Sequence, residues 1–122
     1  MDIEKITASL KNASSELALQ TASQKNEALL SVSDSIEKNR KSSQEANALD
    51  VKNARERGMS ESLVERLSLD DKKIDSIIDS FKLIISQTDP VGEEVAGWKT
   101  PAGMTIRQVR VPLGVVAIIY ES

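Results

Sequence analysis

The last thirteen residues of this chain, Arg110 to Ser122, limit its fold more than any other stretch. They contain an unbroken apolar run, residues 115–119, in which four of the five residues are β-branched. Such a run is typical of a strand buried on both faces, as in the parallel sheets of α/β proteins. A helix is the alternative, but the β-branched content and the nearby Pro112 and Gly114 favour a strand. A parallel strand needs neighbours brought back by crossover connections. We therefore expect this sequence to be the front part of a larger fold.

Residues 1–89 carry the periodicity of amphipathic helices. The first helix is predicted from apolar residues spaced three and four apart, which are Ile3, Ile6, Leu10, Ala13 and Leu17. Thr21 with Gln24 predicts a capping box at the start of a second helix, whose inner face would be Leu29, Val32 and Ile36. The basic cluster Lys38-Asn39-Arg40-Lys41 is interpreted as a solvated end of that helix, where cations are favoured.

Three further helices are predicted before residue 89. One runs from about Ser42 to Arg57 and is closed by Gly58 in a left-handed conformation; its inner face would be Ala46, Leu49 and Asn53. Ser60 caps a short helix that carries Leu63, Val64 and Leu67. The clearest helix is capped by Asp70 or Ser68, and its broad apolar stripe is expected to form core: Ile74, Ile77, Ile78, Phe81, Ile84 and Ile85.

After the helices the pattern becomes extended. Asp89 precedes Pro90 and is therefore a predicted helix boundary. The run Thr100-Pro101-Ala102-Gly103 suits a β-turn, and the segments on either side, 93–99 and 104–111, are predicted to pair as a hairpin.

The composition excludes several classes of site within the 122 residues. Cysteine and histidine are both absent, which excludes disulfides, thiolate metal sites and cysteine or histidine catalysis here. The formal net charge of −3 gives no basis for nucleic-acid binding. No stretch is apolar enough to predict a membrane span. The acidic pairs Glu93-Glu94 and Asp70-Asp71 are interpreted as surface and helix-start charges. Accordingly, no catalytic residue and no metal ligand is predicted.

Four stretches, in order along the chain, resemble one known family. They are Asn47-Ala48-Leu49-Asp50 with Ala54 and Gly58, Glu65-Arg66-Leu67-Ser68-Leu69, Asp89-Pro90-Val91-Gly92, and Arg110 to Val115 continuing through Ile119 to Ser122. Together they resemble the γ-glutamyl phosphate reductases, or glutamate-5-semialdehyde dehydrogenases, of the aldehyde dehydrogenase superfamily. Glu65 is a small departure, since the family commonly has aspartate there. The resemblance covers the N-terminal third or less of the family's length.

The resemblance implies an α/β parent fold with a Rossmann-type cofactor domain. Residues 1–89 would be the helical part of that domain, residues 90–112 an oligomerisation hairpin, and residues 113–122 the first strand of its sheet. The rest of that domain and the catalytic domain would lie outside this sequence.

The resemblance also implies an activity, namely the NADPH-dependent reduction of γ-glutamyl phosphate to glutamate-5-semialdehyde and phosphate in proline biosynthesis. A cysteine would attack the acyl phosphate and form a thioester, and the nicotinamide would reduce it. Because this chain has no cysteine, we expect it to be inactive alone. Tyr120, Glu121 and Ser122 lie at the end of the predicted strand, where open α/β sheets bind ligands. The resemblance implies that this strand end lines the nicotinamide-ribose side of the cofactor.

The same resemblance implies a homo-oligomer that assembles through Glu93 to Val111, with a glutamate kinase as a further partner. The alternative for this hairpin is that it folds back over its own helices. From the composition we expect a cytoplasmic protein that binds neither nucleic acid nor membrane. The alternative is a free-standing helical interaction module without catalysis. A complete domain of that kind would not end on an unpaired buried strand, so the first reading is preferred.

Overall fold

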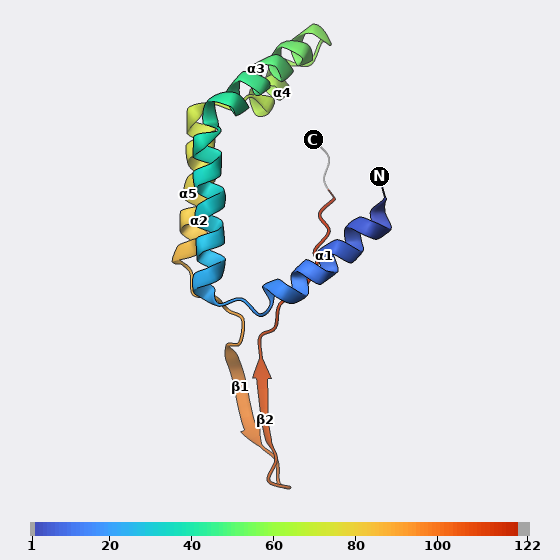
Figure 1. Cartoon of the computed structure of the whole chain (residues 1–122), viewed down its shortest axis with the longest axis vertical. Coiled ribbons are helices and arrows are strands. Elements are labelled where there is room, and N and C mark those ends of the chain that lie inside the picture. The colour runs from blue at the N-terminus through green and yellow to red at the C-terminus, as the bar shows by residue number, and fades with distance from the viewer. Residues whose placement is uncertain (1, 120–122) are drawn as a thin grey trace. The chain divides into compact units, whose positions relative to one another are not determined.

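The computed structural model describes residues 2–119. Over this range it has five helices followed by a two-stranded antiparallel sheet (Figure 1). Internal contacts divide the chain into two compact units. One comprises the chain up to Lys25 together with the chain from Thr88 on, and the other runs from Asn26 to Gln87. The predicted mostly helical segment followed by a hairpin is confirmed.

The first unit begins with helix α1, Ile3–Leu17, as the apolar spacing predicts. Asp2 caps it, because its side chain accepts a hydrogen bond from the Lys5 N–H at 3.2 Å. The apolar face of α1 is not buried, and Ile6 and Leu10 are exposed. The helix therefore forms from local signals, while its apolar face is uncovered in this structure.

A β-hairpin is the other regular element of the first unit, with β1 at Glu94–Lys99 and β2 at Thr105–Val109. Its turn closes where predicted, since the Gly103 N–H donates to the Thr100 carbonyl at 2.9 Å. Gly103 has a φ of 85°, a left-handed conformation that favours glycine. The predicted hairpin and turn are confirmed.

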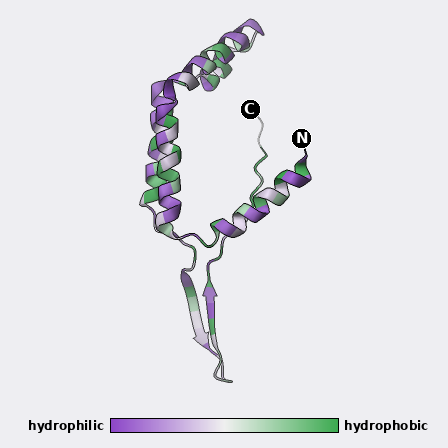
Figure 2. Ribbon diagram, in the orientation of Figure 1, coloured by the Kyte–Doolittle hydropathy of each residue, from purple (hydrophilic) through white to green (hydrophobic). Residues whose placement is uncertain are grey.

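The strand predicted over residues 115–119 is not formed. Residues 110–119 have no regular secondary structure, and Ile119 is 98% exposed. A strand exists only through backbone hydrogen bonds to a neighbouring strand, and none pairs with this run among the residues described. The apolar run is present (Figure 2) but unpaired in this chain by itself. That it forms the first buried strand of a larger sheet stays a prediction.

The second unit contains most of helix α2, Ala22–Lys38, whose start is the predicted capping box. The Thr21 N–H donates to Gln24 Oε1 at 2.9 Å, and the Gln24 N–H donates to Thr21 Oγ1 at 3.3 Å. The predicted inner face is only partly right. Ser33 is the buried residue of α2, whereas Val32 is 46% exposed.

Helix α3, Arg40–Glu56, starts two residues before the predicted Ser42 and ends one residue before the predicted Arg57. Gly58 has a φ of 77°, and the Met59 N–H donates to the Ala54 carbonyl at 3.0 Å, which together form a Schellman cap. The predicted inner face is wrong. Ala54 is buried while Leu49 is 58% exposed, because the short helix α4, Glu61–Leu67, packs against the Ala54 side of α3.

Helix α5, Asp71–Ser86, is capped by Asp70, whose side chain accepts a hydrogen bond from the Lys73 N–H at 2.8 Å. Ile74 is 2% exposed, but Ile77 is 42% exposed and Phe81 is half-buried. The expectation that the whole stripe forms core is therefore wrong. The stripe is wider than the surface that neighbouring elements cover, and only Ala54, Val64 and Ile74 are buried apolar residues in the described part of the chain.

Candidate functional site

The two faces of the hairpin differ in chemistry. Opposite residues of an antiparallel pair share a face, and Trp98 lies opposite Ile106. Their side chains are 52% and 37% exposed, so this face presents open apolar surface. The other face carries the exposed Val109 together with Glu94 and Arg107, whose side chains form an ion pair at 3.5 Å.

Charged side chains on the hairpin pair with one another. A register irregularity between Glu94 and Ala96 turns the Glu94 carboxylate over Gly97, where an added Cβ would lie 2.6 Å from Glu94 Oε1. Near the base of the hairpin, Arg110 and Glu93 form a second ion pair at 2.8 Å. Exposed pairs of this kind contribute little stability. They do, however, pair four of the hairpin's charged side chains and leave out Lys99. The apolar face is therefore the surface best suited to a partner.

A shorter ion pair lies at the root of the hairpin, the segment 89–92 that precedes β1. Lys25, in the first turn of α2, contacts Asp89 at 2.6 Å between Nζ and Oδ2, and each side chain is 22% exposed. The other carboxylate oxygen of Asp89 accepts a hydrogen bond from the Val91 N–H at 3.0 Å. The Lys25 hydrogen bond, and secondly the one from Val91, hold the pKa of Asp89 below its ordinary value.

The root continues into the hairpin through Gly92. Its φ of 88° is left-handed, and its N–H donates to the Arg110 carbonyl at 2.9 Å. The Arg110 N–H in turn donates to the Glu93 carbonyl at 2.9 Å. Backbone pairing thus extends two residues beyond the strands and joins the root directly to the ribbon.

In the second unit, Asn47 joins α3 to the connection between α4 and α5. Its Nδ2 donates to the Leu67 carbonyl at 2.9 Å, and its Oδ1 accepts from the Leu69 N–H at 2.6 Å. Lys73 reaches the same connection, where its Nζ donates to the Glu65 carbonyl at 2.6 Å and the Ser68 carbonyl at 2.5 Å. These carbonyls end α4, and a cation is favoured there.

Arg40 is the centre of a second polar cluster. Its guanidinium contacts Glu37 at 2.6 Å, Asp75 at 2.5 Å and Asp71 at 3.2 Å. The hydrogen bonds that Arg40 donates to Glu37 and Asp75 raise the pKa of Arg40 above its ordinary value. A hydrogen bond from Gln44, followed by that from Arg40, lowers the pKa of Asp71.

The Arg40 cluster was missed by sequence reasoning. Arg40 was interpreted as part of a solvated helix end, yet its side chain is 21% exposed and connects the start of α3 to α5. The partner carboxylates, Asp71 and Asp75, lie more than thirty residues away along the chain. The one available signal was an acidic first turn of α5 on a chain with a basic cluster, which by itself does not identify partners.

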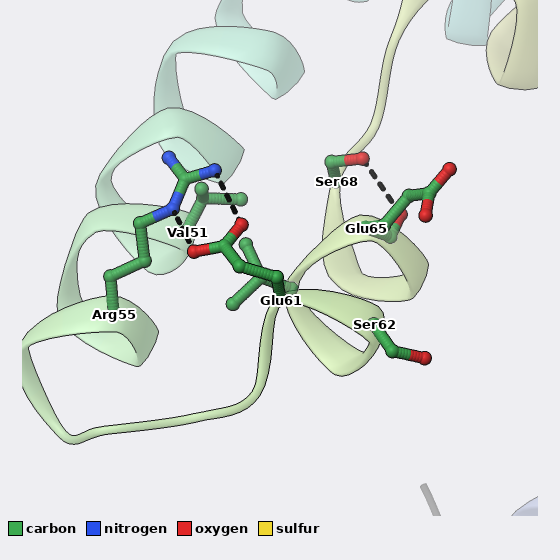
Figure 3. Close-up of a pocket in the computed structure, with 7 residues that line it drawn as sticks. Val51, Arg55, Glu61, Ser62, Glu65 and Ser68 are labelled. Atoms are coloured by element: carbon green, nitrogen blue, oxygen red, sulfur yellow. Dashed lines mark hydrogen bonds and ion pairs between the residues drawn. The ribbon is translucent and has the colours of Figure 1, made fainter.

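A hollow of about 500 Å³ lies between α3 and α4 (Figure 3). Its lining combines one cation, two carboxylates, two hydroxyls and two valines, and consists of Val51, Arg55, Glu61, Ser62, Val64, Glu65 and Ser68. The Arg55 guanidinium is engaged by Glu61 at 3.2 Å. Ser68 donates its hydroxyl hydrogen to the Glu65 carbonyl at 2.8 Å. The free charge of this hollow is therefore negative.

Comparisons with known proteins identify relatives, although no family model matches the chain. A γ-glutamyl phosphate reductase from Brucella anthropi is 46% identical over 110 residues, which are 90% of this chain and 26% of that protein. The one from Thermotoga petrophila is 46% identical over 102 residues, 84% of this chain and 25% of that protein.

Solved structures agree with these relatives. The crystal structure of γ-glutamyl phosphate reductase from Thermotoga maritima matches with a TM-score of 0.87 and 38% identity, over 92% of this chain and 27% of that one. The Saccharomyces cerevisiae enzyme matches with a TM-score of 0.85 and 26% identity, over 92% and 29%. The chain is similar to the N-terminal portion of γ-glutamyl phosphate reductase. It spans about a quarter of the length of the curated relatives it matches.

The residues that carry the similarity to γ-glutamyl phosphate reductase have structural tasks in this chain. Asn47 of the first stretch bonds to Leu67 and Leu69 of the second, and Gly58 closes α3. Asp89 and Gly92 of the third stretch shape the root of the hairpin. The structure therefore brings the stretch around Asn47 into contact with the stretch around Leu67, while the stretch that begins at Asp89 shapes the start of the hairpin.

The residues expected to contact the cofactor of γ-glutamyl phosphate reductase, Tyr120, Glu121 and Ser122, lie outside the described residues. The lining of the hollow between α3 and α4 does not fit NADPH. The hollow between α3 and α4 presents Glu61 and Glu65, whose carboxylates repel phosphate groups, and its one arginine is already paired. We therefore derive no chemical step from this part of the chain.

Two further classes of site are not found among residues 2–119. No three His, Cys, Asp or Glu side chains there are grouped as they would be around a metal ion. None of the helices described is both long and apolar enough to cross a membrane.

Proposed function

We propose that this chain is the N-terminal part of an NADPH-dependent γ-glutamyl phosphate reductase that forms glutamate-5-semialdehyde and phosphate in proline biosynthesis. The observation that carries the proposal is the joint match of sequence and fold to enzymes of that name, at 46% identity and a TM-score of 0.87. A free-standing interaction module is not favoured, because the relatives carry this segment within chains about four times as long.

In this proposal the chain supplies scaffold and the chemistry lies elsewhere in the protein. The sequence has no cysteine to form a thioester, and its polar clusters, around Arg40, Asn47 and Lys73, are occupied in joining helices. The described residues therefore position elements of the larger fold and do not act on the substrate. Tyr120, Glu121 and Ser122 remain the proposed cofactor contacts in this chain.

The test is an assay of the full-length protein that carries this sequence. We expect phosphate-dependent oxidation of glutamate-5-semialdehyde with NADP⁺, and a lower rate with NAD⁺. The purified 122-residue chain, with its mass confirmed, is the matched control and is expected to give no turnover. A folded full-length protein without turnover would contradict the assignment, while turnover by the short chain would contradict its role as scaffold.

We also propose that Glu93 to Val111 forms a subunit interface and that the full-length protein is at least a dimer. The support is the apolar face of Trp98 and Ile106, on a ribbon that carries two internal ion pairs. A two-stranded ribbon is only marginally stable in water, and its outer edges can accept a further strand. A cytoplasmic location and a glutamate kinase partner complete the proposal, and co-purification of the kinase tests the latter.

A further inference from the structure

The ion pair between Lys25 and Asp89 differs from the surface pairs on the hairpin. Both of its side chains are 22% exposed, and the two atoms are 2.6 Å apart. In the Glu93–Arg110 and Glu94–Arg107 pairs every side chain is at least 45% exposed. A pair that is shielded from water is screened less and holds its geometry better than an exposed pair.

The backbone that follows Asp89 is closely specified. Pro90 has a restricted φ and limits the conformation of the residue before it. The second oxygen of Asp89 holds the Val91 N–H at 3.0 Å, and Gly92 makes a left-handed bend before the ribbon begins. The orientation of the backbone at Asp89 therefore largely sets the orientation of β1, because the residues between them have few alternative conformations.

Lys25 attaches this specified segment to a helix. It lies in the first turn of α2, where the capping box of Thr21 and Gln24 fixes the helix start and the Lys25 N–H donates to the Thr21 carbonyl at 3.0 Å. The Lys25–Asp89 contact thus spans 64 residues of sequence and joins two rigid local structures.

We propose that Lys25 and Asp89 are positioning residues that set the direction of the hairpin and thereby control its pairing with a second subunit. The inference rests on the proposed assembly role of Glu93 to Val111. It adds to that role the contact that orients the arm, made by residues outside the arm itself.

The length of β1 explains why a single contact can affect assembly, because a small rotation at its base produces a large displacement at its far end. A six-residue strand such as β1 spans about 20 Å, and neighbouring strands lie about 4.8 Å apart. A rotation of about 20° at the root would move the far end of β1 by about 7 Å, which exceeds the strand spacing. Loss of the anchor is therefore sufficient to disturb strand pairing with a partner, even when the ribbon itself remains folded.

The experiment compares substitutions at the two residues in the full-length protein. Lys25→Met removes the charge and keeps the aliphatic stem. Asp89→Asn removes the charge but keeps an oxygen for the Val91 N–H, so it separates the ion pair from the turn. Lys25→Arg keeps a positive charge at this position. Lys82→Met is the matched control, because it breaks an exposed ion pair to Asp79 at 2.9 Å.

Dimer dissociation is measured by light scattering across a dilution series, and circular dichroism follows the melting of each variant. We expect Lys25→Met and Asp89→Asn to weaken association about tenfold with little change in melting temperature. Lys25→Arg and Lys82→Met should associate like the unsubstituted protein.

Three outcomes would overturn the inference, and they are distinguishable. A dimer unaffected by Lys25→Met removes the anchor role and leaves the assembly proposal intact. Weaker association that merely follows a large fall in melting temperature assigns the pair to folding. An unsubstituted protein that is monomeric at every concentration overturns both the assembly proposal and the anchor, while the reductase assignment is judged separately by the enzyme assay.

Discussion

The side-chain oxygen of Asn47 accepts a hydrogen bond from the Leu69 N–H at 2.6 Å, although 22 residues separate them. The same amide donates to the Leu67 carbonyl. Asn47 therefore satisfies one donor and one acceptor of the connection between α4 and α5, where the backbone leaves helical structure. Asn47 thus links two of the stretches that resemble the reductases.

Replacement of Asn47 tests this connection. Asn47→Ala removes both hydrogen bonds and leaves the half-buried Leu69 N–H without its acceptor, so we expect a loss of about 1–3 kcal/mol of stability. Asn47→Asp keeps the acceptor and should lose less. Urea unfolding of the full-length protein measures the difference. Asn39→Ala is the control, since its amide donates locally to the Ser35 carbonyl; equal effects at both positions would contradict the prediction.

The apolar stripe of α5 supplies a second prediction. Ile74→Ala should destabilise the 122-residue chain by about 2–5 kcal/mol, because Ile74 is 2% exposed. Phe81 is half-buried, so Phe81→Ala should have a smaller effect in the same chain. In the full-length protein we expect Phe81→Ala to approach about 3–5 kcal/mol, if the remaining chain covers the stripe. Denaturant melts of the 122-residue chain and of the full-length protein measure the two effects. If Phe81→Ala destabilised both proteins equally, the remaining chain would not cover the stripe.

The hairpin interface predicts different effects on its two faces. Ile106→Lys places a charge beside Trp98 on the apolar face, and burying that charge would be costly. We expect it to produce a smaller species in light scattering, with helical circular dichroism unchanged. Val109→Lys lies opposite Glu94 on the other face and should affect assembly less. An unchanged mass with a lowered melting temperature would instead place the ribbon against its own helices.

The lowered pKa of Asp89 predicts a response to acid. Because the folded-state pKa lies below the ordinary value near 3.8, the anchor is at full strength above that value and weakens as pH falls through the folded pKa. Lys25→Met removes the first cause of the shift, so the pKa of Asp89 should rise toward its ordinary value. A carboxyl-carbon NMR titration measures it, and an unchanged pKa in Lys25→Met would contradict the contact.

Local features of the fold were predictable because they depend on groups a few residues apart. The Thr21–Gln24 capping box, the left-handed Gly58 and the turn closed by Gly103 each form where expected. Helix periodicity likewise located α1 and α5. The faces were less predictable. On α3 the apolar Leu49 is exposed and Asn47 is half-buried. Asn47 faces the connection after α4 because its side-chain amide hydrogen-bonds to the backbone of Leu67 and Leu69 there.

The sequence by itself determined the capping box of α2, the closing of α3 by Gly58, the hairpin turn and the resemblance to γ-glutamyl phosphate reductase. Hydrogen bonds within a turn and the order of residues need no distant partner. Tertiary structure decided what the charges do. It brought Arg40 to Asp75 and Lys25 to Asp89, contacts across dozens of residues that no local pattern specifies. It also decided that residues 115–119 form no strand among the described residues, because a strand depends on a neighbour whose backbone completes its hydrogen bonds.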